Sequence, residues 1–168
     1  MKQSTKKLLA LLTAGMLCTG SLGFLPASAE TAGETDENNT IETAEAIEVN
    51  TEVTGNLATE DDVDYYRLDL AENSLLELSF QHKDLNSSGR YWKITIADSD
   101  GTTLQEWDNN GSQTVYKTPQ MGFGAGTYYL IVEGDGYRYS DVNYTMTVTA
   151  NTTGSFETER NNTLEDAS

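Results

Sequence analysis

Five oxygen-bearing side chains occur at spacings that could bind a hard metal cation. Glu34, Asp36 and Asn38 alternate along the chain, so an extended backbone would place all three on one face. Asp61 and Asp64 follow a short apolar segment and are expected in a loop between strands. Calcium takes about six to eight oxygen ligands, which carboxylates, the amide and backbone carbonyls of the two segments can supply. The spacing therefore predicts a Ca2+ site, and the alternative is a solvated acidic loop.

The remaining chemistry-bearing residues do not form a catalytic motif. His82 is the only histidine, and neither Gly-x-Ser-x-Gly nor His-Glu-x-x-His occurs in the chain. A hydrolytic triad or a zinc site needs partners that the sequence lacks. We interpret His82 as a surface residue and predict that the chain is not an enzyme.

A second acidic segment begins at Asp98 and reads Asp-Ser-Asp-Gly. It is similar to the first residues of a calcium-binding loop, but a complete loop needs a glutamate at its twelfth position, where this chain has Asn109. We interpret the segment as a hairpin turn.

Aromatic residues could serve a binding role. Tyr137 and Tyr139 lie in a polar loop over residues 134–141. Exposed aromatic rings can stack on sugars or pack against a protein fibre, which makes both tyrosines candidate ligand-binding residues. The alternative is ordinary turn tyrosines with solvated hydroxyls. Trp92 and Tyr144 fall on the apolar faces of expected strands and are assigned to the core.

Alternating apolar and polar residues indicate the elements that position these side chains. Period-two segments, each with one buried face, occupy residues 66–70, 76–80, 92–96, 128–132 and 144–148, with weaker candidates at 49–54, 102–107 and 112–118. Turn sequences rich in Asn, Asp, Ser and Gly separate them. About eight short strands predict an all-β fold, an antiparallel β-sandwich of jelly-roll type.

The segment over residues 41–48 is ambiguous between two structures. Asn39 could cap a short helix there, with Glu42 three residues later in capping-box fashion. So short a helix is unstable alone, and an extended conformation is the alternative.

The chain begins with the features of an export signal. Basic residues precede an apolar stretch, and Ala27-Ser28-Ala29 gives the small-x-small pattern of a cleavage site. The apolar stretch is too short and too interrupted to span a membrane. We predict cleavage after Ala29 and secretion of the remaining chain.

Net charge excludes several classes of partner. The whole chain carries a net charge of −17, and loss of three lysines with the signal leaves 7 basic against 27 acidic residues, a net charge of −20. Phosphates and anionic membranes would be repelled, so we expect no nucleic-acid or membrane partner. The single cysteine precedes the cleavage site, so the domain must fold without disulfides. We expect a monomeric module.

An internal repeat marks the domain boundaries. Residues 34–44 read ETDENNTIETA and residues 157–167 read ETERNNTLEDA, with seven of eleven positions identical at an offset of 123 residues. A repeat at this interval is typical of tandem domains. We therefore predict a signal peptide at 1–29, an acidic linker at 30–48, a sandwich domain at 49–150, and at 151–168 a linker and the start of a truncated second repeat.

The order of these motifs resembles the bacterial pre-peptidase C-terminal domain. The matching segments read ETDENN at 34–39, VTGNL at 53–57, DVDYY at 62–66, GTYYLIV at 126–132 and YTMTV at 144–148. Such domains are jelly-roll-like sandwiches appended to secreted bacterial proteases and other hydrolases, and the collagen-binding domains of clostridial collagenases are related. Several relatives bind calcium between the N-terminal linker and the Asp-rich segment. This chain departs from the pattern at Asp36, where glutamate is usual, so the carboxylate there reaches one methylene less far.

The resemblance implies a non-catalytic accessory module of a secreted bacterial protein, stabilised by calcium and acting as a spacer or targeting domain. One alternative is a substrate-binding module for protein fibres such as collagen or for polysaccharide. Another is part of a secreted protease whose catalytic domain lies outside this chain.

Overall fold

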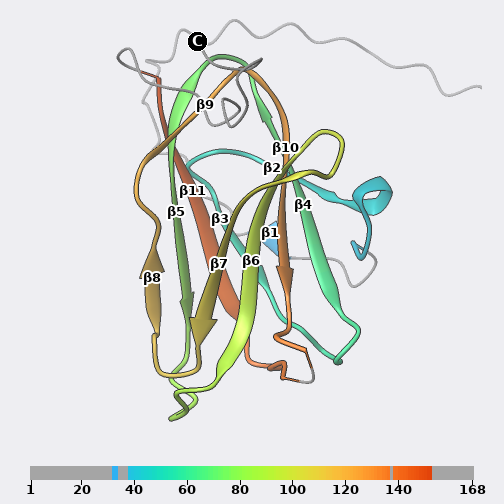
Figure 1. Cartoon of the computed structure of the whole chain (residues 1–168), viewed down its shortest axis with the longest axis vertical. Helices are drawn as coiled ribbons and strands as arrows, with labels where there is room; N and C mark the ends of the chain where they lie inside the picture. Colours follow the sequence, from blue (N-terminus) through green and yellow to red (C-terminus); the bar gives the residue numbers. More distant parts are fainter. Residues whose placement is uncertain (1–31, 34–37, 137, 153–168) are drawn as a thin grey trace, which may run out of the picture.

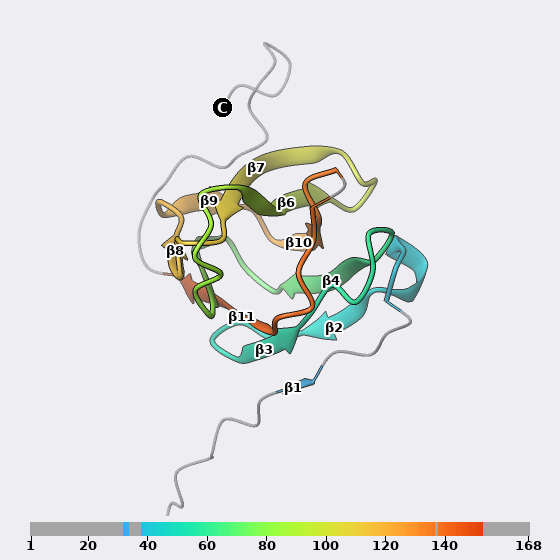
Figure 2. The same ribbon diagram turned by 90° about the horizontal axis from the view of Figure 1, so that it is seen from below.

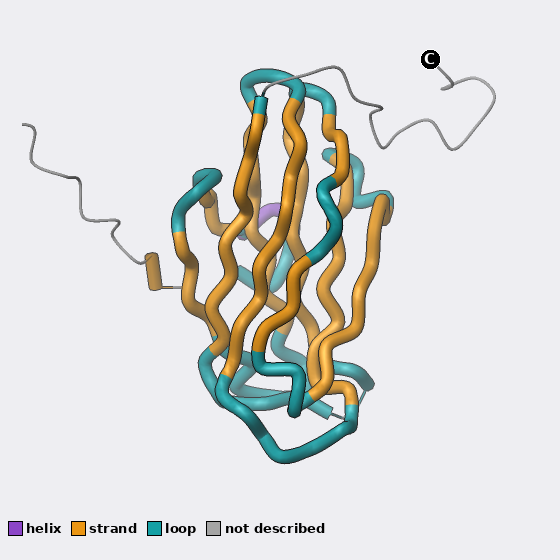
Figure 3. Tube along the Cα trace, turned by 90° about the vertical axis from the view of Figure 1, so that its left-hand side faces the viewer, coloured by secondary structure: helices purple, strands orange, loops and turns teal. Residues whose placement is uncertain are grey.

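Strands account for nearly all the regular structure of the described residues, which are 32–33, 38–136 and 138–152 of the computed structural model. The elements in chain order are β1 (Ala32–Gly33), the 3-10 turn η1 (Ile41–Thr43), β2 (Glu45–Ile47), β3 (Glu52–Gly55), β4 (Val63–Leu70), β5 (Ser74–His82), β6 (Arg90–Asp98), β7 (Thr103–Asn110), β8 (Val115–Lys117), β9 (Met121–Phe123), β10 (Gly126–Glu133) and β11 (Tyr144–Asn151). Figure 1 shows their arrangement, and Figure 3 shows the strands running lengthwise with loops gathered at the two ends.

Two sheets face each other around a common interior, as the end-on view in Figure 2 shows. One sheet has the order β1-β3-β11-β5-β8, with β9 also paired to β5, and the other has the order β2-β4-β10-β6-β7. All the long strands pair antiparallel, so the predicted all-β sandwich is confirmed. The jelly-roll connectivity stays a prediction.

The structure adds three short strands to the eight expected ones. These are β1, β2 and β9, each of two or three residues. The first two pair parallel, β1 with β3 and β2 with β4, so the N-terminal segment supplies one edge strand to each sheet. No helix in the described part of the chain has both the length and the apolar character needed to cross a membrane.

The segment over 41–48 forms a turn followed by a strand. Thr40, not Asn39, caps η1: its hydroxyl accepts from the Thr43 amide, and the Thr43 hydroxyl accepts from the Thr40 amide. The expected cap pair of Asn39 and Glu42 is therefore wrong. The side chain of Asn39 instead accepts a hydrogen bond from the Val63 amide at 3.0 Å, because the chain here lies against the start of β4.

Inward-facing residues of both sheets form one hydrophobic core, as the period-two pattern predicts. Trp92 and Tyr144 are fully buried, which confirms their assignment to the core. The buried residues of this core cluster are Val53, Leu57, Tyr66, Leu68, Leu70, Leu76, Leu78, Phe80, Trp92, Ile94, Ile96, Met121, Phe123, Tyr128, Leu130, Val132, Tyr144, Met146 and Val148.

One edge of β5 is shared between two short strands. β8 pairs with residues 79–81 and β9 pairs with residues 74–76. Thr118 lies between them and continues the ladder: its amide donates to the Leu78 carbonyl at 3.0 Å, and its hydroxyl accepts from the Leu78 amide at 3.0 Å. A side chain thus substitutes for a missing backbone partner along β5.

Candidate functional site

The N-terminal segment meets the start of β4, where two of the predicted metal ligands lie. The carbonyl of Asn38 accepts a hydrogen bond from the Tyr65 amide at 2.9 Å. Together with the bond from Val63 to Asn39, this contact fixes residues 38–39 beside Asp64. Of the predicted ligands, the structure therefore places Asn38 close in space to Asp64. Glu34 and Asp36 lie outside the described residues.

Asn38 is an unusual buried amide. Its side chain is 0% exposed, and neither Nδ2 nor Oδ1 has a hydrogen-bond partner. Buried polar side chains nearly always have partners, because leaving a desolvated donor or acceptor unpaired costs about 1–3 kcal/mol. The arrangement leaves a fully buried amide oxygen available to a ligand.

Asp64 lies at the start of β4 and is also 0% exposed. The Tyr144 hydroxyl donates to its Oδ2 at 2.5 Å, and the Tyr66 and Tyr144 hydroxyls lie 2.7 Å apart. Burial raises the pKa of Tyr144 well above its usual value of 10.0, and the neighbouring Tyr66 and Asp64 raise it further. Tyr144 is therefore held as a neutral donor to a buried carboxyl group.

The loop before β4 contains the predicted ligand Asp61 and is closed by its neighbour Asp62. Asp61 is exposed, whereas Asp62 closes the loop by accepting from the Ala58 amide at 2.7 Å. Sequence analysis missed the role of Asp62, although an aspartate that accepts from a backbone amide nearby in the chain is a common loop device. Within the described residues, no three His, Cys, Asp or Glu side chains converge as a metal site.

His82 is a core residue, so its interpretation as a surface residue was wrong. It is 8% exposed, and its ring centroid lies 4.1 Å from that of Trp92 on the opposite sheet. Its Nδ1 is 2.9 Å from the Lys83 carbonyl oxygen. The inward alternation of β5 continues one step beyond Phe80, and this places the imidazole inside.

The loop before β11 carries the predicted aromatic residues. Tyr139 is 38% exposed, whereas Tyr137 lies outside the described residues. Tyr139 borders a surface hollow together with Tyr91, Leu85 and Val142, and Ser140 and Asp141 add polar groups to the lining. The sequence did not indicate Tyr91, because its placement depends on an irregularity in the pairing of β6 with β7.

The Asp98 segment is the hairpin turn between β6 and β7, as predicted. The Asp98 carboxylate accepts from the amides of Asp100 and Thr102 at 2.9 and 3.0 Å. Gly101 has φ +79°, a conformation that favours glycine. The acidic side chain here folds the turn.

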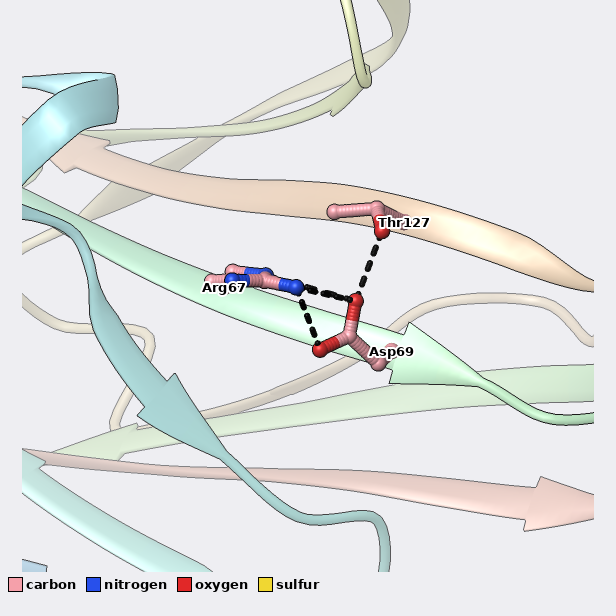
Figure 4. A network of polar contacts seen from close by, with 3 residues as sticks. All are labelled: Arg67, Asp69 and Thr127. Atoms are coloured by element: carbon pink, nitrogen blue, oxygen red, sulfur yellow. Dashed lines mark hydrogen bonds and ion pairs between the residues drawn. The ribbon is translucent and has the colours of Figure 1, made fainter.

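A charged network lies on strands β4 and β10 (Figure 4). Asp69 accepts from the Thr127 hydroxyl at 2.6 Å and forms an ion pair with Arg67 at 3.0 Å. The Thr127 hydrogen bond is the largest cause that lowers the pKa of Asp69 below 3.8; burial opposes it, and the hydrogen bond and charge of Arg67 lower the pKa further. The Asp69 side chain is more than half exposed, so its ion pair with Arg67 contributes little to the stability of the fold.

Comparison with known proteins supports the fold. No family model matches the chain, and no curated protein matches it either. Among solved structures, the pre-peptidase C-terminal domain of collagenase from Bacillus anthracis is similar, with 21% identity and a TM-score of 0.50 over 63% of this chain and 94% of that domain. Weaker likenesses are to a ruminal GH26 endo-β-1,4-mannanase and a β-glucosidase from Paenibacillus barengoltzii. The mannanase has 13% identity and a TM-score of 0.38 over 59% of this chain and 19% of that one. The β-glucosidase has 13% identity and a TM-score of 0.31 over 75% and 12%. The first likeness shows a shared sandwich fold.

Proposed function

We propose that the chain is a non-catalytic accessory module of a secreted bacterial protein, a spacer or targeting domain in which calcium ties the N-terminal segment to the sandwich. The fold shared with the collagenase domain supports the accessory role. A single observation carries the calcium proposal: Asn38, a fully buried amide with both polar atoms unpartnered, is hydrogen-bonded through its backbone to Tyr65, the residue that follows the fully buried Asp64.

These residues fit a hard cation by their chemistry. Asn38 Oδ1 and the Asp64 carboxylate are oxygen donors of the kind that calcium prefers. Glu34, Asp36 and Asp61 complete the proposed ligand set. A bound ion would supply positive charge where carboxylates otherwise repel one another. It would also fix residues 34–38 against β4.

The test is thermal unfolding of the chain in millimolar calcium and then in chelator. A ligand that binds only the folded state stabilises by about 2.7 kcal/mol at a hundred times its dissociation constant. For a domain of this size we expect the melting temperature to rise by about 5–10 °C.

Two variants and a control locate the effect. Asn38→Leu and Asp64→Asn should each remove the calcium response, whereas Asp100→Asn, at an exposed turn, should keep it. Identical melting curves with calcium and with chelator for the wild type would refute the site. A response retained by Asp64→Asn would place the ion elsewhere.

The position of the single histidine supports the non-catalytic role. The only histidine is packed against Trp92 and is 8% exposed, with its Nε2 atom buried, so a substrate does not reach its basic nitrogen. Purified chain should therefore not hydrolyse general protease or esterase substrates. Turnover that disappears in His82→Gln would contradict the proposal.

A second candidate function is binding of a protein fibre, such as collagen, or of polysaccharide. The hollow lined by Tyr91, Leu85 and the exposed Tyr139 favours it, because aromatic side chains at a surface hollow provide area for stacking. Changing Tyr137 and Tyr139 to alanine should weaken pull-down on insoluble collagen or polysaccharide without changing the melting temperature. Absence of wild-type binding to every such matrix would exclude this candidate.

Secretion and the wider protein are further parts of the proposal. Export predicts a mature protein whose first residue is Glu30, which N-terminal sequencing of the exported form would identify. The alternative that the module belongs to a secreted protease is tested by the coding sequence that flanks the repeat motif at 157–167. The net charge of −17 argues against nucleic-acid and membrane partners, and sedimentation would test the expected monomer.

A further inference from the structure

Three polar side chains lie buried in the core near one end of the sandwich, where β5 and β7 end and β6 begins. Trp92 and Asn109 are 0% exposed and His82 is 8% exposed. Four of their atoms, His82 Nε2, Trp92 Nε1 and the Nδ2 and Oδ1 of Asn109, make no hydrogen bond. So many unpartnered polar atoms in one part of a core call for a specific explanation.

The three side chains are neighbours that come from both sheets. The rings of His82 on β5 and Trp92 on β6 have centroids 4.1 Å apart. Trp92 and Asn109 are directly opposite each other in the pairing of β6 with β7, and both are buried. Side chains opposite each other on one face of a sheet have Cβ atoms about 4.5–5.5 Å apart. The four atoms thus belong to one small region between the sheets.

The hydrogen-bonding capacity of this region is defined by its contacts. A carbonyl oxygen can only accept, so His82 Nδ1 carries the hydrogen that Lys83 accepts. In the neutral ring, Nε2 is then an acceptor. Trp92 Nε1 and Asn109 Nδ2 are donors, and Asn109 Oδ1 is a second acceptor.

This combination of donors and acceptors selects the ligand. A metal cation would meet two N–H groups that cannot coordinate it. An anion would meet the lone pairs of the imidazole and of the amide oxygen. Water offers two donors and two acceptors, and a buried water typically makes about three hydrogen bonds.

We propose that one ordered water molecule is bound between the sheets, accepting from Trp92 Nε1 and Asn109 Nδ2 and donating to His82 Nε2. The water joins β5 of one sheet to β6 and β7 of the other. Its role is structural, because it satisfies groups that would otherwise oppose burial.

The test uses magnetisation transfer from water to indole protons in the isotopically labelled chain. We expect a cross-peak between water and the indole N–H proton of Trp92, with the sign that is typical of a water molecule bound for a long time. Trp107, the other tryptophan, is only partly buried and serves as the internal control for transient surface water. Absence of transfer at Trp92 would overturn the proposal. A scalar coupling between Asn109 Nδ2 and His82 Nε2 would do the same, because it would show a direct hydrogen bond in place of the water.

A matched pair of variants tests the assignment. Asn109→Leu removes both amide partners and should abolish the Trp92 cross-peak. Asn110→Leu, one residue further along, changes an amide that accepts from the Ser112 backbone and should leave the cross-peak intact. An unchanged cross-peak in Asn109→Leu would overturn the proposal. If Asn109→Leu does not fold, the wild-type measurement still decides.

Discussion

The Tyr144 hydroxyl donates to the Asp64 carboxyl group across 2.5 Å, which joins the last described strand to the start of β4 inside the core. Tyr66 extends the contact, with its hydroxyl 2.7 Å from that of Tyr144. The buried carboxyl group of the candidate metal site is therefore oriented by a tyrosine 80 residues away in sequence.

Tyr144→Phe should destabilise the fold more than Tyr66→Phe. The first change removes the hydrogen bond to Asp64, worth about 1.5–3 kcal/mol, together with the contact to the Tyr66 hydroxyl, whereas the second removes only the contact between hydroxyls, worth about 0.5–1.5 kcal/mol. Chemical denaturation of both variants measures the difference. Equal losses of unfolding free energy would mean that the hydrogen bond from Tyr144 to Asp64 is no stronger than a bond between neutral groups.

Magnesium should stabilise the chain much less than calcium at equal concentration. Magnesium demands a tighter octahedral shell and gives up its waters reluctantly, and a buried amide and carboxyl group suit it poorly. Melting curves in each ion, measured after treatment with chelator, make the comparison. An equal effect of both ions would point to general screening of the acidic surface.

Thr118→Val should destabilise the sandwich, because the Leu78 amide loses its acceptor in the interval between β8 and β9. We expect a loss of about 1–3 kcal/mol, the cost of a buried unpaired donor. Thr118→Ser retains the hydroxyl and is the control, expected to lose much less. Hydrogen exchange at the Leu78 amide should accelerate in the valine variant and stay slow in the serine variant.

Thr127→Val should raise the pKa of Asp69 toward 3.8, because the largest cause of its lowered value is the Thr127 hydroxyl. A carboxylate with a lowered pKa adds stability above pH 3.8, and that stability is lost as the pH falls through the folded value. The variant should therefore lose less stability on acidification below pH 3.8 than the wild type. Carbon-detected titration of the Asp69 carboxylate gives the pKa, with exposed Thr149→Val as control.

Much of the fold was predictable because long strands carry a strong period-two signal. β4, β5, β10 and β11 bury alternate residues along most of their eight or nine positions, whereas β6 alternates only in its first half and is buried throughout residues 94–98. β2 and β9 have three residues each, too few for any alternation to be recognised. Their existence depends on partners distant in sequence, which local pattern does not encode.

The candidate site was predictable in part for a similar reason. Residue type and spacing single out Asp64 and Asn38 as candidate ligands, but the sequence does not indicate their complete burial, which accompanies the docking of residues 38–39 on β4. The sequence did not predict the burial of His82, because the last apolar residue of the alternating pattern is Phe80. The strand nevertheless continues to His82, which also faces the interior. A polar residue at an inward position has no sequence signal to separate it from a surface residue.

The position of β11 within its sheet has a mechanical consequence. This strand lies between β3 and β5 and is hydrogen-bonded on both sides, and the chain leaves it after Asn151. A pulling force applied through that exit acts along the strand and loads both ladders in shear, so many hydrogen bonds must break together. The N-terminal strands β1 and β2 each have a single partner and would instead detach separately. Under tension, the domain would therefore loosen from its N-terminal side while its C-terminal anchorage holds.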